Sequence, residues 1–356
     1  MISLLLIILF LLLLLFGAPV FAVISGLTLF LLFSGQIDSS AMIIEMHRIA
    51  TTPLLVAIPL FTFAGYLLSE SGATKRLVRL SDAILGWLPG GLSIIALLTC
   101  ATFTALTGAT GLTIIALGGI LFPAMLRSRY PEKFSLGLLT TSGTLGLLFP
   151  PSLPLIIYAI VAKVGIDKLF LAGILPGTLL VILLSAFSVQ KAASAGVPRT
   201  GLSGSEVLNA LRAALWELPL PVVVLGGIYS GYFVVSEAAA ITAAYVLLIE
   251  VAIYRDIKWR ELPQIMRKSM TLVGGILIIL GAALGLTNYL IDEQIPMKML
   301  DFFKTHIVSP QVFLIVLNFF LLAVGCTMGI FSALTVVVPL ISPIAQAYGI
   351  HPIHLG

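Results

Sequence analysis

Long apolar runs separated by short polar connections dominate this chain. A helix needs about 20 apolar residues to cross about 30 Å of hydrocarbon, and continuous runs favour helices over the alternating strands of a β-barrel. The expected membrane-spanning segments are 2–33, 53–69, 138–161, 169–189, 215–233, 237–253 and 269–290. The first run lacks the basic start of a signal peptide, so we expect a long first helix that bends at Gly17-Ala18-Pro19.

Two further apolar runs, 92–126 and 311–343, are each interrupted by small, uncharged, hydroxyl-rich residues. Such turns expose backbone groups, which lipid does not tolerate but a wet cavity inside a protein does. We therefore expect both runs to be re-entrant hairpins that enter and leave the membrane on one side. Interrupted segments in the two halves of a membrane protein indicate a transport site at the interface of the repeats.

The composition agrees with a membrane protein. Hydrophobic residues make up 60% of the chain and charged residues 10%, whereas about a quarter of a soluble domain is charged. We expect an all-α polytopic membrane protein in a lipid bilayer. Orientation in a membrane explains the net charge of +4, so we expect no nucleic-acid partner. Cys100 and Cys326 both lie in apolar runs, which favours neither a disulfide framework nor a metal cluster.

The basic residues sort onto two sides of this arrangement. Fourteen of the nineteen Lys and Arg residues fall in one set of connections, 70–82, 127–133, 190–213 and 254–268. The other five fall in 34–52, 162–168 and 291–310. The positive-inside rule places the first set in the cytoplasm, so the first hairpin opens from the cytoplasm and the second from outside. That is an inverted-topology repeat. If each hairpin instead crossed the membrane twice, every connection would still lie on the same side. Charge alone therefore does not distinguish re-entrant hairpins from full crossings.

The first hairpin contains five threonines within twelve residues, around Gly108 and Gly111: Thr102, Thr104, Thr107, Thr110 and Thr113. Glycine lets the backbone turn, threonine supplies hydroxyl oxygens, and helix ends supply free carbonyls. Such uncharged oxygens suit Na⁺ in transporters with interrupted helices. The alternative is that Thr and Gly only allow tight helix packing. A second break nearby favours the ion site for the cluster as a whole.

That second break is the segment 140–154, which carries Ser142-Gly143-Thr144 and Pro150-Pro151-Ser152 inside an apolar run. Proline lacks the N–H donor and clashes with the preceding turn, so we expect the helix to be broken and to resume near Pro151. The free N–H groups of the second half would favour an anion such as a substrate carboxylate. A simple proline kink is the alternative, but Ser142-Gly143-Thr144 is more polar than a kink requires.

Other candidates are weaker. Glu237 stands at the start of a span, where it is either a cap-region charge or an intramembrane carboxylate that couples an ion. The chain contains no P-loop, no His-Glu-x-x-His and no Gly-x-Ser-x-Gly, so we expect neither ATP binding through a P-loop nor an enzyme. An intramembrane enzyme remains the least favoured alternative.

Four stretches resemble one family, the large membrane subunit of tripartite ATP-independent periplasmic (TRAP) transporters. They are similar to its motifs in matching order from end to end: Ala57 to Phe61, Ser142 to Ser152, Gly227 to Ala239, and Tyr348 to Gly356. The resemblance implies an elevator-type secondary transporter of the ion-transporter superfamily, in a bacterial or archaeal cytoplasmic membrane. It also implies symport of an organic acid, such as a dicarboxylate or a sugar acid, with Na⁺ as the coupling ion. The implied partners are a small four-helix membrane subunit and a periplasmic substrate-binding protein.

The resemblance also assigns site residues. A first Na⁺ site would involve Thr107, Gly108 and Ala109 together with Ser142, Gly143 and Thr144, and a second would involve the turn that contains Thr327 and Gly329. We expect the substrate near these groups, and the candidate substrate-binding residues are Thr110, Ser142, Thr144, Pro150, Pro151 and Ser152. The family often has Asp where this chain has Gly329, which puts the second ion site in question.

The expected organisation follows from the repeats. It comprises scaffold helices (1–91), the transport element of repeat one (92–161), connecting and scaffold helices (162–310) and the hairpin of repeat two (311–356). The counterpart of the broken span is expected after Gly356, so we expect repeat two to be incomplete and the sequence to be truncated. The alternatives left open are a self-sufficient carrier or channel of the same superfamily and a non-transporting remnant.

Overall fold

The computed structural model describes residues 9–10, 12–13, 16–88, 90–197, 201, 203–307 and 309–356. Within these ranges the secondary structure consists of helices, without strands. Six helices are long and apolar enough to cross a membrane, and up to eight spans result if each bent pair counts as one. The fold is therefore that of an all-α polytopic membrane protein, which confirms the expected fold class.

The chain divides into two compact units, each of which takes residues from several parts of the sequence. Unit 1 consists of Met1–Leu55, Ile157–Gly165 and Leu272–Gly356, and unit 2 of Val56–Ile156 and Ile166–Thr271. Neither unit corresponds to a single continuous segment, because α9 (Leu153–Ala162) and α14 (Leu262–Asp292) contribute residues to both. The four-part division of the chain into scaffold and transport elements stays a prediction.

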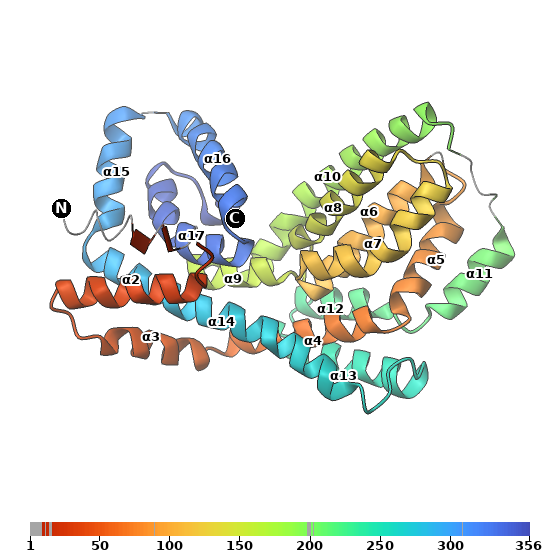
Figure 1. The fold of residues 1–356 in the computed structure, drawn as a ribbon, viewed down its shortest axis with the longest axis horizontal. Helices are drawn as coiled ribbons and strands as arrows, with labels where there is room; N and C mark the ends of the chain where they lie inside the picture. Colours follow the sequence, from red (N-terminus) through yellow and green to blue (C-terminus); the bar gives the residue numbers. More distant parts are fainter. Residues whose placement is uncertain are drawn as a thin grey trace. The chain divides into compact units, whose positions relative to one another are not determined.

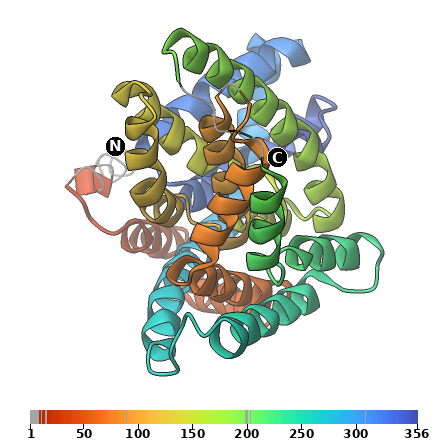
Figure 2. The same ribbon diagram turned by 90° about the vertical axis from the view of Figure 1, so that its right-hand side faces the viewer.

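Helix α6 (Gly91–Thr107) is the centre of unit 2. It is apolar on all sides and most of its residues are buried, as expected of a helix surrounded by others. Its neighbours are α4, α5, α7, α8 and α10, of which α7, α8 and α10 lie beside it in Figure 1, and α4 also pairs with α13. Figure 2 turns the same ribbon by 90°. The other elements of unit 2 are α4 (Ala57–Glu70), α5 (Ala73–Leu85), α7 (Thr110–Arg127), α8 (Glu132–Leu145), η2 (Gly146–Leu148), α10 (Ile166–Ser194), α11 (Gly204–Ala213), α12 (Pro219–Tyr229), α13 (Val235–Leu247) and η3 (Leu248–Ile253). The short helix η1 (Pro53–Val56) precedes α4 and is divided between the two units.

Helix α17 (Ile330–Ala347) lies at the core of unit 1 and packs on α15, α16 and α18. Its apolar residues Val337, Ile341 and Ile344 share one buried cluster with Phe313, whose ring stacks on Tyr348 at 4.6 Å between centroids. The remaining helices of the unit are α2 (Val20–Ser34), α3 (Ser40–Ala50), α15 (Ile295–His306), α16 (Pro310–Thr327) and α18 (Pro352–Leu355).

The expected spans agree with the helices at most positions, and the first run is bent as expected. Gly17 has a left-handed backbone with φ 83°, Pro19 is the N-cap of α2, and the helix resumes at Val20. Residues 1–8, 11, 14 and 15 of this run lie outside the described part. The run 215–233 is helical only over Pro219–Tyr229, which is shorter than a membrane requires.

The polar connections contain amphipathic helices, which the sequence pattern did not predict. These are α3, α5, α11 and α15. In α5, Thr74 and Leu80 are buried while Lys75 and Arg79 are exposed, so one face packs on the protein and the other is charged. The hydropathy of such helices is too low to mark a span, so they do not stand out as apolar runs.

Contacts within each unit join connections that were assigned to the same side of the membrane. In unit 1, Arg48, Lys163 and Ile291 line one cavity of about 580 Å³. In unit 2, Arg79 pairs with Glu206 at 2.8 Å, and Lys268 pairs with Glu70 at 2.6 Å. These contacts agree with the sorting of basic residues, although the sidedness itself stays a prediction. Arg199, which was assigned to the cytoplasm, lies outside the described residues.

Candidate functional site

The first interruption lies between α6 and α7, which together form hairpin 1. Helix α6 ends at Thr107, and Gly108 adopts a left-handed conformation with φ 63°. Ala109 is extended and is the N-cap of α7, which begins at Thr110. A residue with a side chain would be strained at φ 63°, so the glycine is needed for this turn. The interruption predicted at Gly108 is present.

Three of the five threonines form a hydroxyl cluster inside hairpin 1. Thr104 Oγ1 donates to Thr113 Oγ1 at 2.8 Å, and Thr107 Oγ1 lies 3.4 Å from the same oxygen. Thr113 Oγ1 is also 3.3 Å from the Ala109 carbonyl, and all three threonines are 0% exposed. The cluster therefore ties the end of α6 to the start of α7. Thr102 is not part of it, because its hydroxyl donates to the Leu98 carbonyl on the outer face of α6.

The second interruption separates α8 from α9 and bends their axes by 45°. Helix α8 ends at Leu145 and is followed by the single turn η2, after which Phe149 is extended and Pro150-Pro151 is a cis peptide. We call residues 149–152 the α8–α9 break. Its position fits the steric rule that the residue before proline leaves the helical region. Helix α9 resumes at Leu153, two residues later than the expected start near Pro151.

The position of the break differs from the sequence prediction in one respect. Ser142-Gly143-Thr144 is helical and belongs to the last turn of α8. A proline at position 150 disturbs the residue before it and the carbonyl four residues earlier, so the helix can continue to Leu145. This polar triplet forms the C-terminal end of helix α8 and is not a non-helical segment.

Hairpin 1 contacts both helices that flank the α8–α9 break. A Cβ on Gly108 would collide with the side chain of Leu153, the first residue of α9. A Cβ on Gly143 would stand 2.6 Å from Ile114 of α7 and 3.6 Å from the Thr110 carbonyl. Small residues on both partners thus let the two helix interruptions meet at one place in unit 2.

The polar side chains at this contact are mostly bonded locally. Ser142 Oγ donates to the Leu139 carbonyl at 3.0 Å and is buried, and Thr144 Oγ1 donates to the Thr141 carbonyl at 2.8 Å and is exposed. Ser152 differs, because its hydroxyl is fully buried and has no hydrogen-bond partner among the described residues. An unpaired buried hydroxyl is costly, which makes Ser152 the polar group of the break with free bonding capacity.

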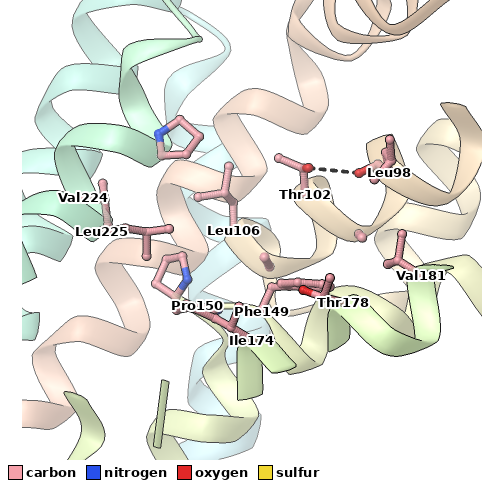
Figure 3. A pocket seen from close by; sticks show the side chains of 14 residues that line it. Leu98, Thr102, Leu106, Phe149, Pro150, Ile174, Thr178, Val181, Val224 and Leu225 are labelled. Carbon is pink, nitrogen blue, oxygen red and sulfur yellow. Dashed lines mark hydrogen bonds between the residues drawn. The ribbon is translucent and has the colours of Figure 1, made fainter. Parts of the chain in front are cut away.

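The cavity beside the break is apolar. It has a volume of about 380 Å³ and lies between α6, α10, α12 and residues 149–151 (Figure 3). Only Thr102 and Thr178 contribute polar side chains to its lining, and Thr102 is bonded to its own helix. Pro150 and Pro151 therefore face an apolar space, which does not suit the carboxylate expected next to them.

Hairpin 2 is formed by α16 and α17, and its interruption lies at Met328-Gly329. Both residues are extended, and Gly329 is exposed, so that a Cβ at this position would have no other atom within 4 Å. The side chain of Thr327 lies outside the described part. Because hairpin 2 belongs to unit 1, its relation to hairpin 1 stays a prediction.

Glu237 has a local role. Its Oε2 accepts a hydrogen bond of 3.1 Å from the backbone N–H of Val234, at the start of α13, and the residue is exposed. This geometry is that of a carboxylate capping a helix N-terminus. The structure thus favours the cap over the ion-coupling carboxylate.

Unit 2 also contains a buried ionic cluster that was not predicted from the sequence. Arg76 of α5 donates to Glu217 Oε1 and to Asp256 Oδ2, each at 2.5 Å, and to Glu250 Oε2 at 3.0 Å. Burial acts to lower the pKa of Arg76, but hydrogen bonds to Asp256 and Glu217 raise it above its ordinary value, so the guanidinium stays charged. These residues are up to 180 positions apart. Only the tertiary fold brings them together.

Comparison with known proteins agrees with this architecture. The model of the family described as "Tripartite ATP-independent periplasmic transporter, DctM component" matches residues 6–356. The chain belongs to this family. Because the match runs over almost the whole chain, the resemblance inferred from the four motifs is confirmed, and the DctM family is one of transporters rather than enzymes.

Named relatives within the DctM family differ in substrate. The chain is 36% identical to the C4-dicarboxylate TRAP transporter large permease protein DctM of Pseudomonas aeruginosa, over 93% of this chain and 78% of the relative. It is 31% identical to the ectoine TRAP transporter large permease protein TeaC of Halomonas elongata, over 97% and 82%. It is 30% identical to the sialic acid TRAP transporter large permease protein SiaM of Vibrio cholerae, over 85% and 71%. The chain is thus a large permease subunit of a TRAP transporter and a multi-pass membrane protein.

Proposed function

We propose that this chain is the permease subunit of a Na⁺-coupled symporter that imports an organic acid across the cytoplasmic membrane by an elevator movement. It would work with a small four-helix membrane subunit and a periplasmic substrate-binding protein. The relatives' names support the class of substrate, since C4-dicarboxylates and sialic acid are organic acids.

The observation that carries this proposal is the contact between Gly108 and Leu153. It places the turn of hairpin 1 against the start of α9. Interrupted helices in transporters provide N-terminal ends for anionic groups and free carbonyls for Na⁺ at the same depth. Two interruptions that meet in one unit supply both kinds of group without a charged side chain.

The oxygens at this contact fit Na⁺ in kind. Thr107 offers a hydroxyl and Ala109 a carbonyl, while Ser142, Gly143 and Thr144 lie in the last turn of α8, where carbonyls lack α-helical donors. Among the described residues no group of three or more His, Cys, Asp or Glu could hold a metal. Uncharged oxygens therefore favour a monovalent cation, and the same reasoning extends to the backbone at Thr327 and Gly329 for a second ion.

The substrate carboxylate is best placed at the start of α9. Ser152 has a hydroxyl there without a partner among the described residues, and the carbonyl of Thr110, at the start of α7, lies near Gly143 of α8. Helix N-termini favour negative charge because their first N–H groups are unpaired. The apolar cavity lined by Pro150 and Pro151 is not part of this site, so these two prolines would act through the geometry of the break.

The test is uptake by the protein reconstituted into vesicles with its two partner proteins. We expect uptake of a radiolabelled dicarboxylate or sialic acid to require an inward Na⁺ gradient. Thr107→Val should weaken the Na⁺ dependence, whereas Thr102→Val should leave it unchanged, because the Thr102 hydroxyl bonds its own helix. Uptake that does not depend on the Na⁺ gradient would refute the proposed coupling of transport to Na⁺. Uptake without the binding protein supports a self-sufficient carrier or channel, and no uptake under any condition supports a non-transporting remnant.

A further inference from the structure

The ionic cluster around Arg76 contains more buried negative charge than positive charge. Glu250 is 0% exposed and Glu217 is 6% exposed, and Arg76 is the one cation that both contact in the described part of the chain. Asp256, the third carboxylate, has a side chain that is 29% exposed and also accepts the Gly72 N–H at 2.9 Å. Partial exposure lets water solvate the carboxyl group of Asp256. The buried part of the cluster is therefore left with two carboxylates and one guanidinium.

Leaving this excess charge buried is unfavourable, because an ion removed from water needs a partner of its own. A proton or a small cation could neutralise it. The Oε2 atom of Glu217 decides between the two, since it is buried and has no hydrogen-bond partner among the described residues. Water does not reach this oxygen, so there is no room beside it for a cation and its ligands, whereas a proton needs no space.

The hydrogen bonds of Arg76 locate the proton. Arg76 Nη2 lies 3.0 Å from Glu250 Oε2 and 3.3 Å from Oε1, so both Glu250 oxygens already face the guanidinium. Glu217 uses only Oε1, which accepts from Arg76 Nε. A neutral Glu217 keeps that bond through its carbonyl oxygen and carries the proton on Oε2.

We infer that Glu217 and Glu250 together form a proton-binding site, with one proton held on Glu217 Oε2 in the folded protein. The site joins α5, the turn before α12, and η3. Glu250 lies in η3, a π-helical segment, and such segments are frequent at functional positions. The inference goes beyond the proposed transport function and does not depend on it.

The other titratable groups around the site do not supply the missing positive charge. Tyr254 stacks on Arg76, with the guanidinium carbon 3.8 Å from the ring centroid, and donates its hydroxyl to the Ala213 carbonyl. Tyr245 donates to the Trp216 carbonyl. Arg79 on the next turn of α5 is paired with Glu206 and is half exposed.

The proton held on Glu217 makes the stability of the protein depend on pH. A carboxyl whose pKa is raised by folding contributes most to stability at low pH, and its contribution is lost as the pH rises through the folded pKa. We expect the midpoint of thermal unfolding of the purified protein, followed by tryptophan fluorescence, to fall as the pH rises above the ordinary carboxyl pKa of 4.5. Glu217→Gln, which keeps the acceptor for Arg76 and removes the acid, should flatten this fall.

The decisive experiment is infrared difference spectroscopy of the full-length protein at neutral pH. The wild type should show the carbonyl stretch of a neutral carboxylic acid, Glu217→Gln should lose it, and Glu206→Gln, which alters an exposed carboxylate nearby, should keep it. Should Glu217→Gln not fold, Glu217→Asp should shift the band. The inference is overturned if the wild type has no such band at neutral pH, or if the band is the same in every variant.

Discussion

Thr104 donates a 2.8 Å hydrogen bond to Thr113 across the two arms of hairpin 1, and Thr107 approaches the same hydroxyl. Thr113→Val removes the oxygen that both arms share and leaves the buried hydroxyl of Thr104 without this partner. We expect a loss of about 1–3 kcal/mol in the free energy of unfolding. Thermal unfolding in detergent measures it, with Thr102→Val as the matched control at an exposed hydroxyl that bonds its own helix. Equal effects of the two substitutions would show that the shared hydroxyl has no special role.

The turn of hairpin 1 depends on Gly108. Gly108→Ala adds a methyl group that collides with Leu153 and forces alanine into a left-handed backbone. The left-handed conformation alone costs roughly 1–2 kcal/mol, and the displaced Leu153 should also lower Na⁺-driven uptake. Gly111→Ala is the control, because Gly111 is helical and no atom lies within 4 Å of its Cβ position. Normal uptake by Gly108→Ala would show that transport does not need the contact between Gly108 and Leu153, and would contradict the proposed function.

The packing of η2 on α6 depends on Gly146. A Cβ there would collide with the Ala101 carbonyl and with Thr104. We expect Gly146→Ala to destabilise unit 2 by about 1–3 kcal/mol through overpacking. Gly137→Ala, at an open helical position of α8, should stabilise it by about 0.5–1 kcal/mol. Unfolding midpoints that move in the same direction would contradict this difference.

Arg76 should be far more important for stability than the neighbouring Arg79. Arg76→Met leaves the buried Glu250 carboxylate without its cation, which costs about 3–5 kcal/mol when one partner of a buried ion pair is removed. Arg79→Met breaks an exposed pair with Glu206 and should cost less than about 1 kcal/mol. The comparison of unfolding midpoints tests this, and an equally mild effect at Arg76 would show that the cluster does not stabilise the fold.

The sides of the membrane can be tested by labelling single cysteines, after Cys100→Ala and Cys326→Ala remove the native thiols. Lys163 and Arg255 are both exposed and fall in opposite sets of connections. We expect Lys163→Cys to react with a membrane-impermeant maleimide in intact cells, and Arg255→Cys to react only after permeabilisation. The reverse pattern would invert the topology and the direction in which each hairpin opens.

The interruptions of the helices could be predicted from the sequence, whereas the tertiary clusters could not. Gly108 and Pro150-Pro151 were recognisable because glycine and proline have backbone constraints that act locally. The same constraints explain why Ser142-Gly143-Thr144 is helical although it was placed in the broken segment 140–154. Polar residues alone do not end a helix, and the prolines that end it stand several residues later. Arg76 and Glu250 gave no such signal. One lies in a basic connection and the other near the end of an apolar run, and 174 residues separate them.

The inward position of Arg76 bears on how the chain is inserted during biogenesis. Without Arg76, the connections assigned to the cytoplasm still hold thirteen Lys and Arg residues against five on the opposite face. Removing Arg76 therefore hardly changes the difference in basic residues between the two sides, which sets the orientation of the chain in the membrane. Arg76 can therefore be varied to study the assembly of unit 2 without inverting the chain.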